Sequence, residues 1–282
     1  MTIDYDVVII GGSLAGRYAA LSASKLKAKV ALVEPITNGA SNFVNAPYEF
    51  IYHHALGHIS NLSKQLAHVA QLGLYTLCVD TPEKCDISVN TPEAILYAHS
   101  IVSNLQEQHS LALLAAQGVD VIVGDGQFQS SPHLSFAVDA RLLRARTYLL
   151  AMGSRPLIPE IEGLHRTGFL TIPQIWQSLS NSTPPKQWVI FGGVPQSIEL
   201  AQTLARCGYD VTLVVERRNL LPNIDSEIAQ LLCSLLEAEG VRVFIKTSIT
   251  QVRKIDDKKW LQVGDKAIET DEIVVAIAQQ PN

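Results

Sequence analysis

A glycine-rich turn close to the N-terminus holds the residues whose types and spacing point most directly to chemistry. They are Gly11, Gly12, Ser13 and Gly16, and an apolar run precedes them. Glycines at this spacing let a strand turn tightly into a helix, whose N-terminus attracts a diphosphate. Glu34 ends the next apolar run, where a carboxylate accepts hydrogen bonds from ribose hydroxyls. The pattern predicts a dinucleotide site, and the alternative is a tight turn without a ligand.

A second, weaker copy of this pattern lies roughly 180 residues further along the chain. Gly192 and Gly193 follow an apolar strand, and the strand after the next helix ends at Glu216. Val194 and Ser197 replace the glycines that allow close diphosphate approach and tight helix packing. Two dinucleotide units in one chain suggest hydride transfer between a nicotinamide and a flavin. The alternative for the second copy is a purely structural strand–helix–strand unit.

Hydrophobic periodicity predicts the elements that position both turns. Helices are expected after each glycine turn, over 47–72 with a break near Gly57, and from 92 to 117. Strands are expected at 4–10, 29–34, 118–124, 188–191, 210–216, 241–245 and 261–263. Residues 128, 133–138 and 142–150 alternate like an antiparallel meander. The charge run Asp256–Lys259 predicts a solvated hairpin tip.

The totals describe a globular chain. With 282 residues, 47% of them hydrophobic and 17% charged, it has room for about two domains. A net charge of -5 argues against nucleic acid or an anionic membrane as the main partner. No apolar run approaches the ~18 residues of a membrane span. The acidic start enters a strand at once, unlike a signal peptide, so the cytoplasm is the expected location.

Cysteine and histidine patterns give weaker signals. Cys207 and Cys233 lie in apolar helical patterns and are expected to pack, while Cys78 and Cys85 are expected to be free thiols rather than a disulfide. The four cysteines form no CxxC pair, and none has histidine or carboxylate neighbours at metal-finger spacing. His54 and His58 have the i, i+4 spacing of a metal pair but lack the accompanying glutamate, so no metal site is predicted.

Taken together, the motifs resemble the pyridine nucleotide–disulfide oxidoreductase family, of the dihydrolipoamide dehydrogenase and mercuric reductase type. The resemblance runs the length of the chain. The matching stretches are Val8–Gly16, Glu34, Gly124–Phe128, Ala151–Pro156, Gly192 and Gly193 with Glu199, and Leu220–Pro222. It implies an α/β fold with two Rossmann-like dinucleotide-binding domains, an FAD-binding domain over 1–157 and an NAD(P)-binding domain over 158–282.

The same resemblance implies roles for individual residues. FAD would be held by Gly11, Gly12, Ser13, Leu14, Ala15, Gly16, Glu34, Pro35, Gly126, Ala151, Met152 and Gly153. The nicotinamide nucleotide would be held by Gly192, Gly193, Pro195, Gln196 and Glu216, and Glu199 would stand near the flavin ring. Glu216 favours NADH, whereas the arginines that follow it could accept the 2′-phosphate of NADPH.

The chain departs from the family pattern at the positions that carry its disulfide chemistry. Ser41 and Ala46 stand where the family has a redox-active cysteine pair, so neither disulfide nor Hg(II) reduction is expected. Phe50 replaces the lysine that would pair with Glu199, which leaves that carboxylate without an expected partner. We assign no catalytic residue from the sequence.

The resemblance also implies that the first sheet is incomplete, because the family returns to its FAD domain after the equivalent of Pro281 and then adds an interface domain. Weak FAD retention is therefore expected, and a homodimer only with such a domain. The favoured hypothesis is an FAD-dependent oxidoreductase that takes electrons from NAD(P)H without an active-site disulfide. The alternative is a catalytically inactive nucleotide-binding or regulatory relative.

Overall fold

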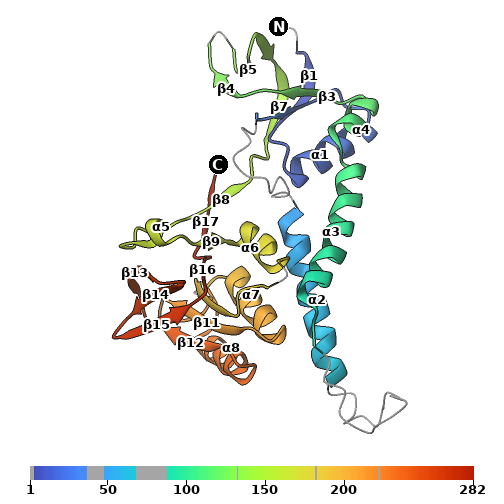
Figure 1. Cartoon of the computed structure of the whole chain (residues 1–282). Coiled ribbons are helices and arrows are strands. Elements are labelled where there is room, and N and C mark those ends of the chain that lie inside the picture. The colour runs from blue at the N-terminus through green and yellow to red at the C-terminus, as the bar shows by residue number, and fades with distance from the viewer. Residues whose placement is uncertain (1–2, 37–47, 68–87, 132, 182, 222) are drawn as a thin grey trace, which may run out of the picture. The chain divides into compact units, whose positions relative to one another are not determined.

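The computed structural model describes residues 3–36, 48–67, 88–131, 133–181, 183–221 and 223–282 (Figure 1). The chain forms two compact units. Unit 1 comprises residues 1–48, 101–155 and 280–282, and unit 2 comprises residues 49–100 and 156–279. Each unit contains a parallel sheet with helices packed on it, as expected for an α/β fold with Rossmann-like halves.

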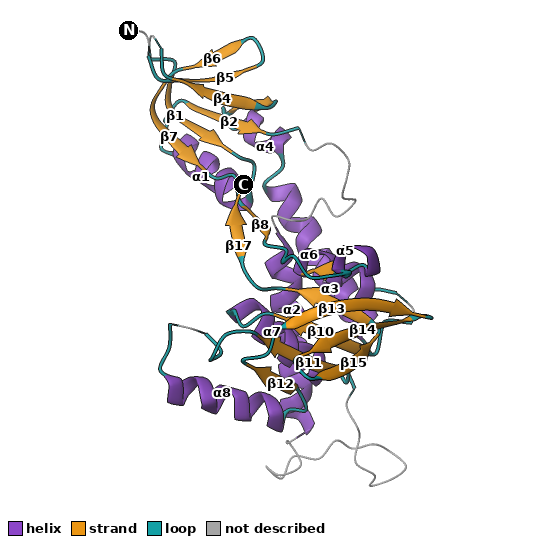
Figure 2. Cartoon of the chain, turned by 90° about the vertical axis from the view of Figure 1, so that its left-hand side faces the viewer, coloured by secondary structure: helices purple, strands orange, loops and turns teal. Residues whose placement is uncertain are grey.

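Unit 1 is built on a parallel four-stranded sheet in the order β3-β2-β1-β7. Alternate residues of β1 face opposite sides of this sheet. Val8 and Ile10 pack toward the β4–β6 strands, whereas Ile9 packs toward α1 and α4. Figure 2 shows α1 and β4–β6 on the two sides of the sheet. The elements are β1 Tyr5–Ile10, α1 Leu14–Lys25, β2 Val30–Glu34, α4 Leu111–Ala116, β3 Asp120–Val123, β4 Gly126–Gln129, β5 Ser135–Val138, β6 Arg141–Leu143 and β7 Ala145–Leu150.

The meander is smaller than the alternation predicts. Strands β4, β5 and β6 are antiparallel, but β7 pairs in parallel with β1, with Tyr148 opposite Val8. The expectation of a single meander through residue 150 is therefore wrong. Alternation identifies a strand without identifying its partner, and β7 finds hydrogen-bonding groups on the open edge of β1.

Two helix predictions are also corrected. The helix expected from 92 to 117 is divided into α3 Thr91–Gln108 and α4, because Ser110 caps α4 by accepting a hydrogen bond from the Leu113 amide at 3.3 Å. No break occurs near Gly57, since α2 runs unbroken over Glu49–Ala67. Gly57 faces Thr203 of α7, whose hydroxyl would lie in ordinary contact, 3.5 Å from a Cβ added at position 57.

Unit 2 is built on a parallel five-stranded sheet in the order β12-β11-β10-β16-β9, and a three-stranded antiparallel sheet packs against it through a shared apolar core. The parallel strands are β9 Leu170–Thr171, β10 Gln187–Phe191, β11 Asp210–Val215, β12 Arg242–Ile245 and β16 Glu272–Val275. The antiparallel strands are β13 Ile249–Ile255, β14 Lys258–Val263 and β15 Lys266–Thr270. The helices are α5 Leu164–Thr167, α6 Ile172–Leu179, α7 Pro195–Arg206 and α8 Ser226–Ala238. The remaining short strands are β8 Ser154–Pro156 and β17 Gln279–Pro281.

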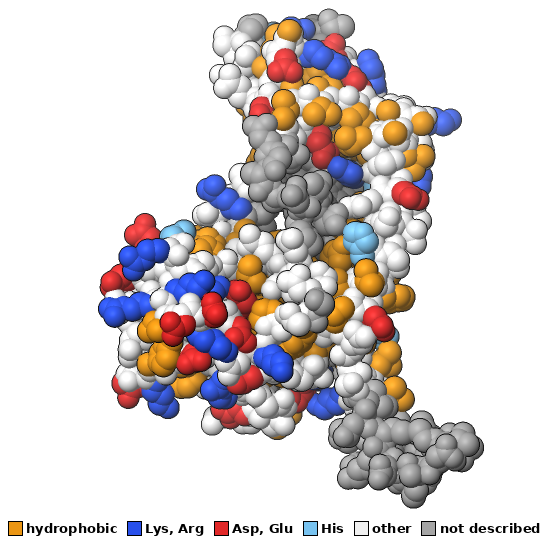
Figure 3. All heavy atoms as spheres, in the orientation of Figure 1, with side chains coloured by type: hydrophobic (Ala, Val, Ile, Leu, Met, Phe, Trp, Pro, Cys, Tyr) orange, Lys and Arg blue, Asp and Glu red, His pale blue; other side chains and the backbone are white. Residues whose placement is uncertain are grey.

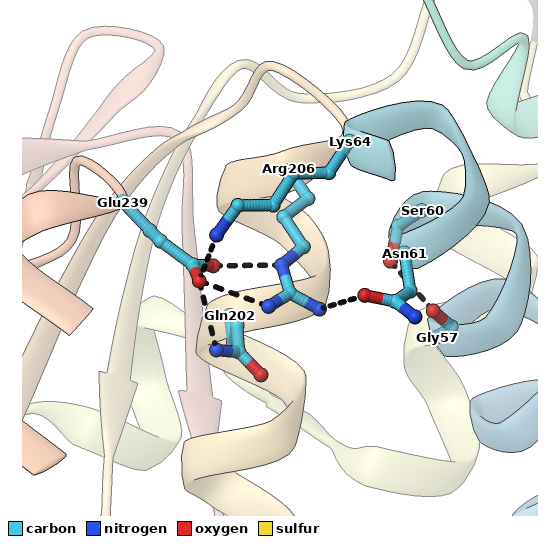
Figure 4. Close-up of polar contacts among 7 residues, drawn as sticks. All are labelled: Gly57, Ser60, Asn61, Lys64, Gln202, Arg206 and Glu239. Carbon is cyan, nitrogen blue, oxygen red and sulfur yellow. Dashed lines mark hydrogen bonds and ion pairs between the residues drawn. The ribbon is translucent and has the colours of Figure 1, made fainter. Parts of the chain in front are cut away.

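An ion-pair network joins α2 and α7 to the end of α8 (Figure 4). Glu239 caps the C-terminus of α8 and forms two hydrogen bonds with Arg206, of 2.7 and 2.9 Å. Lys64 of α2 pairs with the same carboxylate, and Gln202 donates to it at 3.3 Å. The network anchors α2 in unit 2.

The hairpin between β13 and β14 has a narrower charged tip than expected. Asp256 and Asp257 form the turn, and Asp256 adopts a left-handed φ of 52°. Lys258 and Lys259 belong to β14, where they form ion pairs with Asp271 and Glu272. The prediction that all four charges are simply solvated is therefore wrong for the lysines. On the face shown in Figure 3, acidic and basic side chains intermingle over this part of unit 2.

Candidate functional site

The first glycine turn depends on the absence of side chains. Gly11 has a φ of 109°, and a Cβ there would lie 2.3 Å from the carbonyl oxygen of Ala151. A Cβ at Gly16 would lie 2.1 Å from the carbonyl oxygen of Gly11. Both contacts are shorter than any atom pair tolerates, so β1 can pass into α1 here only with glycine at these positions. The prediction of a tight turn made by these glycines is confirmed.

Ser13 stabilises the start of α1. Its hydroxyl accepts a hydrogen bond from the Gly16 amide at 3.3 Å and donates one to the carbonyl of Ala151 at 2.7 Å. Leu14 and Ala15 then begin α1, whose first amides have no partner within the helix. The serine thus serves as an N-cap where the dinucleotide pattern has a glycine.

Glu34 lies directly over this turn. A Cβ added at Gly12 would lie 1.6 Å from Glu34 Oε2, so the carboxylate occupies the space that a side chain at position 12 would take. Glu34 Oε1 accepts a hydrogen bond of 2.8 Å from Arg17. Arg17 is a site residue that the motifs did not single out, although a cation in the first turn of the helix after the glycines is a visible signal.

The other predicted FAD contacts are partly gathered around the turn. The Ala151 amide donates to the carbonyl of Ile10 at 2.7 Å, which holds the 151–153 segment beside β1. Met152 is 44% exposed, and Gly153 has a φ of 73°. Pro35 is exposed at the end of β2.

Gly126 lies apart from these residues in β4. A Cβ there would lie 2.4 Å from the Phe136 ring, so this glycine is required by the packing of the β4–β6 strands. The structure gives it a packing role, and its predicted contact with adenine stays a prediction.

The second glycine turn has the same construction. Gly192 has a φ of 152°, and a Cβ there would lie 2.0 Å from the carbonyl oxygen of Ala276. A Cβ at Gly193 would lie 2.7 Å from a methyl group of Val215. Ser197 is fully buried and donates to the carbonyl of Val194 at 2.7 Å, so the helix packs closely without the expected glycine.

A cavity of about 280 Å³ opens beside this turn. Its lining includes Val194, Pro195 and Gln196 from the turn and Val275 and Ala276 from the end of β16. It lies at the carboxyl ends of parallel strands, where open α/β sheets bind their ligands. Val194 lines this cavity, and the obstruction of a diphosphate by its side chain stays a prediction.

Glu216 directly follows β11 and is exposed, and the two arginines after it, Arg217 and Arg218, are exposed as well. An acid at this position favours NADH, and cations favour the 2′-phosphate of NADPH. Both groups are accessible, so both nucleotides stay candidates.

Glu199 has a histidine near it but no hydrogen bond to that ring, because His53 Nε2 is buried and has no hydrogen-bond partner among the described residues. His53 Nε2 lies 3.9 Å from Glu199 Oε2, and the His53 ring lies 5.8 Å from the Trp176 ring between centroids. Burial lowers the pKa of His53 below its usual value, and the Glu199 carboxylate opposes this shift only in part. The lowered pKa favours the neutral form of His53. Phe50, which stands where the family has a lysine, is 55% exposed.

Two cysteines lie in the described part of the chain, and neither has the lowered pKa of a reactive thiol. Burial raises the pKa of Cys207 to about 12, which keeps its thiol protonated, and also raises that of Cys233. Both cysteines are only partly buried, although the sequence predicts that they are packing residues of the interior. Within the described ranges, no three or more histidine, cysteine and acidic side chains are grouped as metal ligands.

Several predictions lie outside the described residues, namely those for Ser41, Ala46, Cys78 and Cys85. Helices long and apolar enough to cross a bilayer are absent from the part of the chain that the structure describes.

The residues at the first turn fit a dinucleotide. The turn is bare of side chains, and a helix N-terminus follows it. Glu34 Oε2 is buried and accepts no hydrogen bond from any described residue. A ribose hydroxyl would supply the donor that this oxygen lacks.

Two curated proteins illustrate the similarity of this chain to known sequences. Mercuric reductase from Lysinibacillus sphaericus is 26% identical over 285 residues, covering 99% of this chain and 49% of the relative. Dihydrolipoyl dehydrogenase from Acholeplasma laidlawii is 27% identical over 296 residues, covering 100% of this chain and 80% of the relative. The chain spans about half the length of most of the curated relatives that it matches.

A solved structure shows the same fold. The Cu(II) complex of the HOCl-induced flavoprotein disulfide reductase RclA from Escherichia coli matches with a TM-score of 0.75 at 21% identity, covering 100% of this chain and 58% of that one. The sequence profile of the pyridine nucleotide-disulphide oxidoreductase family matches residues 5–282. With its two glycine turns and this match over nearly its whole length, the chain belongs to the pyridine nucleotide-disulphide oxidoreductase family.

Proposed function

We propose that the chain forms the FAD- and NAD(P)H-binding part of an oxidoreductase that works without an active-site disulfide. The family is FAD-dependent and uses NAD(P)H. The observation that carries the proposal is the first turn, where glycines are required by contact and the buried Glu34 oxygen lacks a donor.

The residues of the first turn have distinct roles in this proposal. Gly11 and Gly16 keep the diphosphate region free of side chains, and the N-terminus of α1 attracts its charge. Glu34 accepts hydrogen bonds from the adenosine ribose. When bound, FAD supplies the group that accepts hydride from NAD(P)H and gives the electrons to an acceptor such as a quinone, a dye or dioxygen.

The second turn would receive the nicotinamide nucleotide in the cavity that Pro195 and Gln196 line. The His53–Glu199 pair contributes a neutral imidazole and an exposed carboxylate in the same unit. Glu199 is the residue that the family resemblance assigns to the flavin, so this pair is our candidate for handling protons near the ring.

Disulfide chemistry is left out of the proposal for two reasons. Ser41 and Ala46 cannot form a disulfide. Cys207 has a raised pKa of about 12, which makes it a poor nucleophile.

A second candidate function is a regulatory relative that binds nucleotide without turnover. Val194, which lines the cavity and narrows the approach to the second turn, favours this candidate. In that case FAD or another nucleotide would stabilise the chain, but NAD(P)H would reduce nothing.

Spectroscopy of the purified chain separates these functions. The chain is reconstituted with FAD, and flavin absorbance gives the stoichiometry of binding. Anaerobic addition of NADH or NADPH then tests whether the flavin absorbance bleaches, and a dye or quinone tests onward transfer. Stoichiometric flavin that bleaches supports the oxidoreductase. Bound flavin that neither donor reduces supports the regulatory candidate, and no flavin binding contradicts the FAD site itself.

A further inference from the structure

Arg17 is fixed on three sides at the first glycine turn. Its Nε donates to the carbonyl of Gly12 at 2.9 Å, and its Nη1 donates to the carbonyl of His109 at 3.3 Å. Its Nη2 donates to Glu34 Oε1 at 2.8 Å. The guanidinium is planar and holds its donors in fixed directions, so these contacts leave the side chain little freedom. Only 16% of the side chain is exposed.

The contact with Arg17 leaves the two oxygens of Glu34 in different situations. Oε1 is bonded to Arg17, whereas Oε2 lies against Gly12, buried and without a donor among the described residues. A buried carboxylate oxygen without a donor costs free energy, and a ligand hydroxyl can recover it. The carboxylate cannot turn freely to find another donor, because Arg17 holds its other oxygen.

The surroundings of the Arg17–Glu34 pair are buried, which also favours a fixed position for the Glu34 carboxylate. The Tyr48 side chain is 1% exposed, and burial raises its pKa, with the charges of Arg17 and Glu34 also acting on its hydroxyl. The ion pair therefore lies in a partly dry environment, in which charge-assisted hydrogen bonds gain strength.

We propose that Arg17 is a positioning residue that holds Glu34 so that Oε2 receives a hydroxyl of the adenosine ribose. Arg17 thereby sets the preference of the first turn for ribose over deoxyribose nucleotides. The inference rests on the proposed FAD site and adds to it a residue that acts only through Glu34. A purely structural arginine would instead connect β2, α1 and the chain near His109 without affecting how the ribose is recognised.

Nucleotides that differ by one hydroxyl separate these two roles. ADP, 2′-deoxy-ADP and 3′-deoxy-ADP are titrated as competitors of FAD, whose flavin fluorescence reports binding at its own site. With the unaltered chain, we expect loss of one of the two hydroxyls to weaken competition by about tenfold, the size of one hydrogen bond to a charged group. In Arg17→Met, we expect that ratio to fall to about twofold.

Two further variants are measured in the same way: Arg17→Lys as a conservative replacement and Arg146→Met as a control. Lysine keeps the charge but cannot reach three acceptors in a fixed fork, so we expect an intermediate ratio. Arg146, whose side chain is 71% exposed, is a matched surface arginine whose replacement should leave the ratio unchanged. Thermal unfolding shows which variants are folded. If Arg17→Met does not fold, the ratio measured with Arg17→Lys decides between the two roles.

Three outcomes overturn the inference. If Arg17→Met weakens ADP and both deoxy analogues equally, then Arg17 is only structural. If Arg17→Met strengthens ADP binding, then Arg17 competes with the ribose for Glu34. If FAD binds the unaltered chain but the deoxy analogues compete as well as ADP, then Glu34 does not read the ribose. Failure of FAD to bind the unaltered chain contradicts the proposed function, and with it this inference.

Discussion

Replacing Glu239 by glutamine removes the negative charge that Arg206 and Lys64 share in unit 2 (Figure 4). The Glu239 side chain is 12% exposed and that of Arg206 is 17% exposed, while Lys64 is 41% exposed. The Arg206 pair therefore resembles a buried ion pair, which costs about 3–5 kcal/mol to break. The Lys64 pair is nearer to the surface class, worth about 0.2–1 kcal/mol.

Glutamine retains one carbonyl acceptor for Arg206, so the expected loss lies below the full cost of breaking the pair. We expect Glu239→Gln to lower the free energy of unfolding of unit 2 by about 2 kcal/mol. For a domain of this size, that corresponds to roughly 4–8 °C in Tm. Glu237→Gln is the matched control, because Glu237 is exposed on the same helix.

Tryptophan fluorescence during urea unfolding is the suitable assay. The three tryptophans of the chain, Trp176, Trp188 and Trp260, all lie in unit 2. Their signal therefore follows the unit that holds the network and not unit 1.

The pH dependence of this loss follows from the pKa of Glu239. Arg206 and Lys64 lower that pKa although burial opposes them. A lowered pKa in the folded state stabilises the chain above the ordinary glutamate value, and the stabilisation is lost as the pH falls through the folded value. The gap between the unaltered chain and Glu239→Gln should thus be full at pH 7 and shrink below about pH 4.5. Equal stability at pH 7, or a gap that does not shrink in acid, would refute the reasoning.

Three further predictions concern the two turns and one thiol. Gly11→Ala should abolish FAD binding and destabilise unit 1, because its Cβ would meet a backbone oxygen at 2.3 Å. Gly118→Ala, at a similar positive φ but in open space, should cost only about 1–2 kcal/mol. Thermal unfolding and flavin absorbance measure both variants, and similar losses would contradict the steric argument. Val194→Gly should strengthen NAD(P)H binding about tenfold, because it removes a side chain that lines the cavity. A fluorescence titration with the nucleotide measures the affinity, and an unchanged affinity would show that Val194 is no obstacle. Cys207, whose pKa is raised to about 12, should react with iodoacetamide at pH 8 far more slowly than free cysteine. Mass spectrometry follows the alkylation, and rapid labelling would contradict the raised pKa.

The sequence determined the local construction of this protein. Gly11, Gly16 and Gly192 were recognisable because their spacing after an apolar strand is typical of a tight strand-to-helix turn, which is a local pattern. The backbone oxygens that exclude a side chain at Gly11 and Gly192 belong to Ala151 and Ala276, and only the folded chain brings them there. Glu34 and Glu216 were recognisable because each stands at the end of, or directly after, the strand that follows a glycine turn and its helix. The α/β class followed from the same short-range pattern, and the family match agrees with it.

The tertiary structure decided which strands pair and which side chains contact one another. Strand β7 joins β1 rather than β6, and Lys258 and Lys259 pair with acids from another part of the chain. Arg17 reaches Glu34, and His53 rather than residue 50 faces Glu199. Each of these contacts joins residues that lie 13 or more positions apart in the sequence, and side chains of the same type have many potential partners in the chain. Only the packing of the sheets and helices brings one particular pair together, so periodicity and motif spacing cannot predict the choice.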